Sequence, residues 1–151
     1  MRNKVANGKK GFTIIEVVLV LAVAALIFLI VFLAVPALQR NRRDTARKND
    51  VGRAIAQLEG YASNHNGDYP STIDAAFITE YLDGKFKDPG AGSYSISTTA
   101  ITDASAEGAM QYAKGGKCND DSTVTVTPTN TRHVSVSVKL EQGVAYCQDN
   151  N

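Results

Sequence analysis

The chain has 151 residues, enough for one small domain, and its 16 Lys and Arg residues nearly balance its 15 Asp and Glu residues. This balance argues against a dedicated nucleic-acid binder, which usually carries a basic excess. With two His, two Cys and no Trp, the chain has few residues for a catalytic site, so we expect neither an enzyme nor a cofactor. A run of 19 apolar residues, 17–35, excludes a purely soluble globular protein and a multi-span membrane protein.

Residues 1–11 form a basic leader. They contain four basic residues and no acidic residue, whereas the rest of the chain carries a net charge of −3. Cleavage near residue 11 would therefore invert the charge of the protein. A basic stretch before a membrane segment stays on the cytoplasmic side, which places the C-terminal part of this chain outside.

Residues 12–38 form an apolar segment whose only polar side chains are those of Thr13 and Glu16. The segment is long enough to cross a bilayer as a helix. A cleaved secretory signal and a plain signal anchor are two alternatives. The apolar run exceeds the usual signal-peptide core of about 7–15 residues. Glu16 argues against both alternatives, because a carboxylate is costly in a membrane unless a cation, such as a free amine at Phe12, lies nearby.

The residues around this carboxylate resemble the cleavage motif of type IV prepilins and pseudopilins. The matching stretch is Gly11-Phe12-Thr13-Ile14-Ile15-Glu16, between the basic leader and the apolar run. The resemblance implies that a membrane-embedded prepilin peptidase cuts between Gly11 and Phe12 and that Phe12 becomes N-methylated. It also implies that Glu16 neutralises the N-terminus of a neighbouring subunit during assembly.

The apolar segment departs from the family in two places. Ala24 and Ala25 stand where many relatives have a helix-loosening Gly, and Pro36 lies about three residues later than the usual Pro. Proline costs about 3 kcal/mol inside a soluble helix. We therefore expect a kink or local melting of the helix at Pro36.

Residues 39–64 continue the helix as an amphipathic half. The predicted buried face is Val51, Ala54, Ile55, Leu58 and Ala62, widened by Tyr61. The helix should end at residues 64–67, before Tyr69-Pro70. Residues 65–92 should form a connecting loop with a short helix, capped by Ser71 and buried on the side of Ile73, Ala76, Phe77 and Tyr81. A turn is expected at residues 87–90.

Residues 93–151 change to the alternating pattern of strands. Strands are expected at 94–97, 110–112, 133–140 and 144–147, with 124–126 as a further edge strand. The clearest is 133–140, in which Val and Leu alternate with Ser and Lys. The predicted fold class is therefore α+β and pilin-like, with a long N-terminal helix packed on a small antiparallel sheet.

Cys118 and Cys147 lie in the part of the chain that the topology places outside. An even number of cysteines in an exported domain favours a disulfide, here between a loop and the C-terminal strand. Two reduced thiols are the alternative. Related pilins often have a disulfide-bounded, exposed C-terminal loop, so the resemblance supports the pairing.

Three polar features are weak candidates for a site. The oxygen-rich residues 119–122 lack the spacing of an EF-hand calcium loop and are interpreted as a solvated turn. His65 and His133 are isolated and are interpreted as surface residues. No metal site is predicted.

A basic run follows the apolar segment. Arg40, Arg42, Arg43, Arg47, Lys48 and Arg53 outweigh Asp44 and Asp50 by four charges. This run could pair with acidic patches on neighbouring subunits, bind anionic lipid headgroups before assembly or contact DNA through phosphates.

These features together predict the structural subunit of a type IV pilus, and specifically a major pilin. The precursor should span the inner membrane once, with its N-terminus inside, before subunits assemble into a surface filament. The resemblance implies three partners besides other copies of the chain: the prepilin peptidase, an assembly platform and an assembly ATPase. A minor pilin, a secretion or competence pseudopilin and a monomeric membrane-anchored surface domain are the alternatives. The sequence does not distinguish motility, adhesion and DNA uptake.

Overall fold

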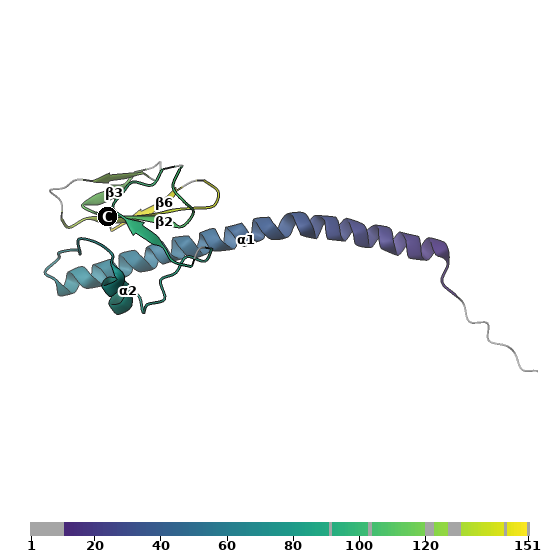
Figure 1. The fold of residues 1–151 in the computed structure, drawn as a ribbon, viewed down its shortest axis with the longest axis horizontal. Helices are drawn as coiled ribbons and strands as arrows, with labels where there is room; N and C mark the ends of the chain where they lie inside the picture. The colour runs from purple at the N-terminus through teal and green to yellow at the C-terminus, as the bar shows by residue number, and fades with distance from the viewer. Residues whose placement is uncertain are drawn as a thin grey trace, which may run out of the picture. The chain divides into compact units, whose positions relative to one another are not determined.

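The computed structural model describes residues 11–90, 92–102, 104–119, 123–126, 131–143 and 145–150. The leader residues 1–10, most of the oxygen-rich turn (residues 120–122) and Val144 lie outside the described residues. The chain divides into two compact units, one ending at Leu38 and the other running from Gln39 to Asn151. Helix α1, Ile14–Asn64, contributes to both units (Figure 1).

The first unit is an apolar helix whose side chains are exposed. Phe12 and Ile14 are 91% and 84% exposed, and every large apolar side chain up to Leu38 is at least 42% exposed. The backbone stays helical at Pro36, so the structure shows no melting at that position. Water would disfavour such a surface, which therefore needs lipid or other apolar helices around it.

The second unit begins with the amphipathic half of α1, which buries the predicted face. Val51, Ala54 and Leu58 are fully buried, and Tyr61 packs at the edge of the core. The helix ends at Asn64, where the backbone NH groups of His65 and Gly67 both donate to the carbonyl of Ala62. Gly67 has a φ of 84°, which suits glycine at a helix C-terminus.

The short helix α2, Ala75–Tyr81, differs from the prediction in its start. Asp74, not Ser71, is the N-cap, and its carboxylate accepts a hydrogen bond from the Phe77 NH at 2.9 Å. The first backbone NH groups of a helix have no partner within the helix, and an Asp immediately before the first turn can accept hydrogen bonds from them. Ser71 lies too far upstream to do so. Phe77 is buried as predicted, but Ala76 is exposed.

The main sheet has four strands in the order β1-β2-β5-β6. The strands are β1 (Ser95–Ser97), β2 (Ala109–Lys114), β5 (Val134–Lys139) and β6 (Ala145–Asp149). β5 pairs antiparallel with both neighbours, but β1 runs parallel to β2, with Ile96 opposite Met110. The predicted antiparallel sheet is thus present in β2, β5 and β6, and only β1 departs from it, because the link from β1 to β2 crosses over instead of forming a hairpin.

Strand β5 is buried on both faces. Val134, Val136 and Val138 join the core under α1, as the alternation predicted. Ser135 and Ser137, which the alternation placed in solvent, are at most 1% exposed. The sequence pattern of β5 thus identified its apolar face, but it did not indicate that the opposite face, which carries the serines, is also buried by another part of the chain.

A second, two-stranded sheet provides that cover. It consists of β3 (Gly116–Cys118) and β4 (Val124–Val126), paired antiparallel. In Figure 1 it lies on the side of the main sheet opposite α1. The predicted strand at 124–126 is thus present, but it pairs with β3, which the sequence did not predict, instead of extending the main sheet.

Candidate assembly sites

The N-terminal site consists of Gly11, Phe12, Thr13 and Glu16. Residues 11–13 are exposed and precede the helix, so the peptide bond after Gly11 is free of helical hydrogen bonding. The carboxylate of Glu16 accepts hydrogen bonds from the Thr13 NH and hydroxyl, both at 2.8 Å. This pairing of residues three apart resembles a capping box, which satisfies the first donors of a helix. Within one chain, Glu16 thus already has a partner at the start of α1.

The basic run lies at the start of the second unit and is divided between buried and exposed positions. Arg47 is 1% exposed, although it is among the cations that we considered for contacts with lipid or DNA. Arg43 binds Glu141 through two guanidinium nitrogens, and Arg53 pairs with Asp50 on the surface. The prediction of lipid or DNA contact was therefore wrong for Arg47, and Arg43 is already engaged within the chain. Arg40, Arg42 and Lys48 remain exposed.

The Arg47 cluster comprises Arg43, Asp44, Arg47, Asp88 and Glu141. The Nε of Arg47 lies 2.6 Å from Asp88 Oδ1, and its Nη2 lies 3.2 Å from Asp88 Oδ2. Its Nη1 contacts Asp44 at 3.1 Å and Glu141 at 3.3 Å. The guanidinium therefore joins three carboxylates, from the helix, from the turn before β1 and from the turn after β5.

This cluster shifts the ionisation of its members. The hydrogen bond from Arg43, with the positive charges of Arg43 and Arg47, lowers the pKa of Glu141 below its usual range. The bond to Asp88 raises the pKa of Arg47, although burial alone would lower it. The charges are thus mutually stabilised, as a buried ion pair requires.

Sequence reasoning did not find this cluster. Asp88 and Glu141 lie 41 and 94 residues from Arg47. Asp88 sits in the predicted turn at residues 87–90, and Glu141 lies between two predicted strands. The one available signal was the excess of arginines over acids on a helix that also had to pack against a core.

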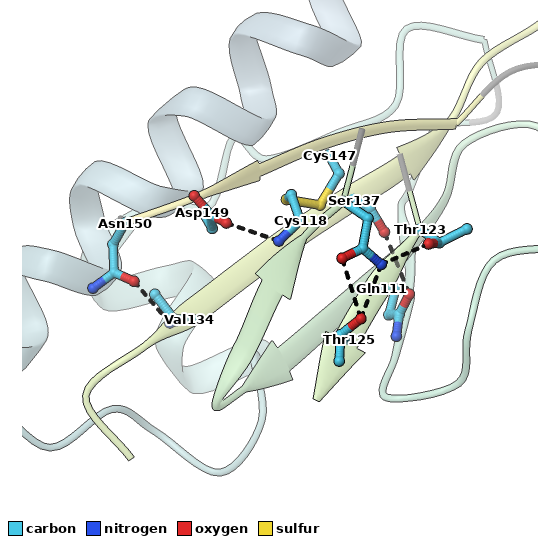
Figure 2. The surroundings of a disulfide bond; sticks show 10 residues. Gln111, Cys118, Thr123, Thr125, Val134, Ser137, Cys147, Asp149 and Asn150 are labelled. Carbon is cyan, nitrogen blue, oxygen red and sulfur yellow. Dashed lines mark hydrogen bonds between the residues drawn. A yellow bond between two sulfur atoms is a disulfide. The ribbon is translucent and has the colours of Figure 1, made fainter. Parts of the chain in front are cut away.

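The disulfide joins Cys118 of β3 to Cys147 of β6, with their Cα atoms 5.8 Å apart (Figure 2). It therefore ties the small sheet to the main sheet, whereas we expected it to start in a loop. Nearby, the Cys118 NH donates to the Asp149 carboxylate at 2.7 Å, and the Val134 NH donates to the Asn150 side chain at 2.9 Å. The C-terminal strand is thus held by one covalent link and by polar contacts on either side.

The two histidines have different surroundings. His65 is exposed, as predicted, and its ring stacks on Tyr61 with centroids 3.8 Å apart. His133 is partly buried, and its Nδ1 has no hydrogen-bond partner among the described residues. Over the part of the chain that the structure describes, no group of three metal-ligating side chains is found.

Comparison with known proteins bears on the N-terminal site. Residues 6–32 match the prokaryotic N-terminal methylation motif. The chain carries the class III signal peptide of the type IV pilin and pseudopilin family. No curated protein and no solved structure is significantly similar to the chain.

The motif and the fold agree on a type IV pilin-like protein. It is a structural protein rather than a catalytic one, and the motif implies processing by a prepilin peptidase and assembly into a pilus-like filament. Helix α1 is, by length and composition, long and apolar enough to cross a membrane. The signal peptide and this apolar helix together imply a membrane-anchored precursor and an extracellular filament.

Proposed function

We propose that this pilin-like protein is the major subunit of a type IV pilus. The observation that carries the proposal is the exposed apolar helix from Ile14 to Leu38, preceded by a class III signal peptide. Such a surface suits lipid before assembly and the helices of neighbouring subunits afterwards. Because leaving lipid gains little hydrophobic energy by itself, assembly requires work from an assembly platform and an ATPase.

Processing fits the geometry of the N-terminal site. Cleavage between Gly11 and Phe12 would release leader 1–11, and N-methylation would follow at Phe12. The new amine of Phe12 and the carboxylate of Glu16 would lie at similar depths in the bilayer. The Glu16 carboxylate of one subunit would then pair with the Phe12 amine of its neighbour. To form that pair, Glu16 must release or share its hydrogen bonds with Thr13.

The orientation follows from the leader charge. The basic residues 1–11 would remain cytoplasmic, residues 12–38 would span the inner membrane, and residues 39–151 would lie outside. Helical residues 39–64, connecting residues 65–92 and sheet residues 93–151 would together form the exported head. The disulfide suits this location, since disulfides persist in oxidising compartments.

The test is the intact mass of the protein in a sheared surface-filament fraction, with and without reductant. We expect residues 12–151 plus one methyl group, and two hydrogens fewer before reduction than after it. The protein should be the most abundant chain of the fraction. A trace amount among more abundant pilins would favour a minor pilin or a pseudopilin. Full-length protein confined to membranes, in cells with active prepilin peptidase, would contradict the proposal in favour of an anchored surface domain.

The exposed cations Arg40 and Arg42 supply a surface for pairing with acidic residues of neighbouring subunits. We expect the double variant Arg40→Glu/Arg42→Glu to lower filament yield without changing the unfolding temperature of the head. Lys85→Glu, an exposed charge reversal near α2, is the matched control. Unchanged yield would leave lipid or phosphate contact as the use of these two arginines.

A further inference from the structure

An aromatic surface lies where α2 packs on the end of α1, within the second unit. The rings of Tyr61 and His65 stack with their centroids 3.8 Å apart, and the Tyr81 ring meets that of Tyr61 edge-on at 5.4 Å. His65 is exposed, and Tyr61 and Tyr81 are partly exposed. The rings therefore cover the edge of the core and still leave aromatic surface in solvent, where another molecule can bind.

The part of the chain that carries these rings is acidic. Residues 54–84 contain five Asp and Glu residues and no Lys or Arg. Asp68 is already in an ion pair, and Asp74 caps α2. Glu80 and Asp83 are exposed, and neither forms an ion pair among the residues that the structure describes. We give the name α2 surface to the set Tyr61, His65, Glu80, Tyr81 and Asp83.

A guanidinium ion is the group that the α2 surface fits best. It stacks on aromatic rings and donates hydrogen bonds to carboxylates, and it is more weakly hydrated than an ammonium ion. Arg42, in the basic run, is exposed and forms no ion pair among the described residues. It precedes the fully buried Val51 by nine residues, which corresponds to about 180° around the helix. Arg42 therefore lies on the face of α1 opposite its own core, where a second copy of the chain can reach it.

The spacing along α1 separates Arg42 from the α2 surface of its own chain. Tyr61 follows Arg42 by 19 residues, which corresponds to about 28 Å along the helix. A contact between the two groups therefore needs two chains. Precursors that enter the membrane in one orientation have parallel helices, so the two chains must be displaced along the helix axis. Each copy then presents a different patch to each neighbour, and a displaced contact of this kind repeats without closing, as in a filament.

We propose that Arg42 of each subunit binds the α2 surface of a neighbouring copy, with its guanidinium paired with Glu80 and lying against the His65 ring. The repeated contact would set an axial displacement of about 28 Å between the two subunits that form it. This inference rests on the proposed role of the protein as a filament subunit, and it names the acidic patch that the basic run contacts.

Charge exchange in cells that assemble the filament tests this contact. Arg42→Glu and Glu80→Arg each bring like charges together at every such contact, so each should lower the yield of sheared filaments about tenfold. The double variant Arg42→Glu/Glu80→Arg restores opposite charges and should recover most of the parent yield. The amount of processed protein in the membrane, measured by immunoblot, shows that each variant is made and cleaved.

Glu59 supplies the matched control for the exchange. It is exposed and precedes Tyr61 by two residues, so it lies about 200° around α1 from that ring. Arg42→Glu/Glu59→Arg has the same net charge as the exchange variant, but its yield should stay as low as that of Arg42→Glu alone. Recovery in both double variants, or in neither, would overturn the pairing of Arg42 with Glu80. Full yield from either single variant would overturn it as well.

The aromatic part of the contact has a separate test. His65→Ala removes an exposed ring and should lower filament yield severalfold while the unfolding temperature of the head changes little. A normal yield would overturn the role of this ring. Absence of the parent protein from the filament fraction would overturn the proposed function itself. Normal parent filaments that do not respond to the charge exchange would overturn only the contact between Arg42 and the α2 surface.

Discussion

The Nε of Arg47 lies 2.6 Å from Oδ1 of Asp88, and both side chains are almost fully excluded from solvent. Their contact joins α1 to the turn that precedes β1. The same turn is fixed by the Gly90 NH, which donates to Asp88 Oδ2 at 2.8 Å. Gly108, with a φ of 74°, lies so close to Asp88 that a Cβ there would collide with the carboxylate. The ion pair thus determines how the connecting segment packs on the helix.

Removing one partner of this pair should destabilise the head strongly. We expect Arg47→Met to lower the free energy of unfolding by about 3–5 kcal/mol, because Asp88 would remain buried without its cation. Urea unfolding followed by circular dichroism measures the change. Arg53→Met removes an exposed pair with Asp50 and should cost no more than about 1 kcal/mol. Similar costs for both variants would contradict the assigned importance of burial.

Acid should weaken the head partly through Glu141. Its pKa is lowered in the folded state by the bond from Arg43, so folding is favoured by this group above the unfolded pKa of about 4.3. That contribution is lost as the pH falls from there through the folded pKa. Glu141→Gln should therefore lower stability at neutral pH and flatten its decline below about pH 4.3. Urea titrations between pH 2 and 7 measure this, with Glu59→Gln, an exposed change, as the control. If the free energy of unfolding fell as steeply with acid in Glu141→Gln as in the parent, the loss of stability at low pH would be due to other carboxylates.

Assembly should depend on Glu16. We expect Glu16→Ala to abolish or sharply reduce surface filaments while cleavage after Gly11 continues, because the neighbouring amine would lose its counter-charge in an apolar core. Filament yield by shearing and leader removal by intact mass are the two readouts. Thr13→Val, which removes one of the two hydrogen bonds from Thr13, should leave the charge pairing intact and assemble more filaments than Glu16→Ala. Normal filaments from Glu16→Ala would refute its assembly role.

Elements with a strong period were predictable from the sequence. The face from Val51 to Ala62 repeats every three to four residues, and β5 alternates apolar with polar side chains, so both apolar faces were identified. The direction of β1 was not, because three residues do not encode whether a strand runs parallel to its neighbour. β3 was missed because Gly116-Lys117-Cys118 has no alternation of apolar side chains.

The N-terminal site and the Arg47 cluster likewise differ in how far the sequence predicts them. The N-terminal site is a contiguous motif and could be recognised from six neighbouring residues. The Arg47 cluster is assembled from three segments that only the folded head brings together. No local pattern indicates that Arg47 is buried, since an arginine on a helix is usually solvated.

The disulfide should stabilise the head against unfolding. Because 28 residues lie between Cys118 and Cys147, we expect the pair of changes Cys118→Ser and Cys147→Ser to cost about 3–4 kcal/mol on the loop-entropy account. Thermal unfolding of the double variant measures the loss. Dithiothreitol should lower the melting temperature of the parent and leave that of the variant unchanged. A parent insensitive to reductant would show that the link adds little to the contacts of β3.

Two glycines should respond in opposite ways to a methyl group. Gly116 of β3 packs so tightly on the main sheet that a Cβ would collide with the Ser135 hydroxyl and the Ala113 carbonyl. We expect Gly116→Ala to lower the free energy of unfolding by about 1–3 kcal/mol, because the two sheets must separate to admit the methyl group. Gly60 lies inside α1 with nothing within 4 Å of an added Cβ, so Gly60→Ala should raise the free energy of unfolding by about 0.5–1 kcal/mol. Urea unfolding of both variants gives the comparison. Gains from both would mean that β3 can move away from β5 at little cost, and the cover over Ser135 would then be loose.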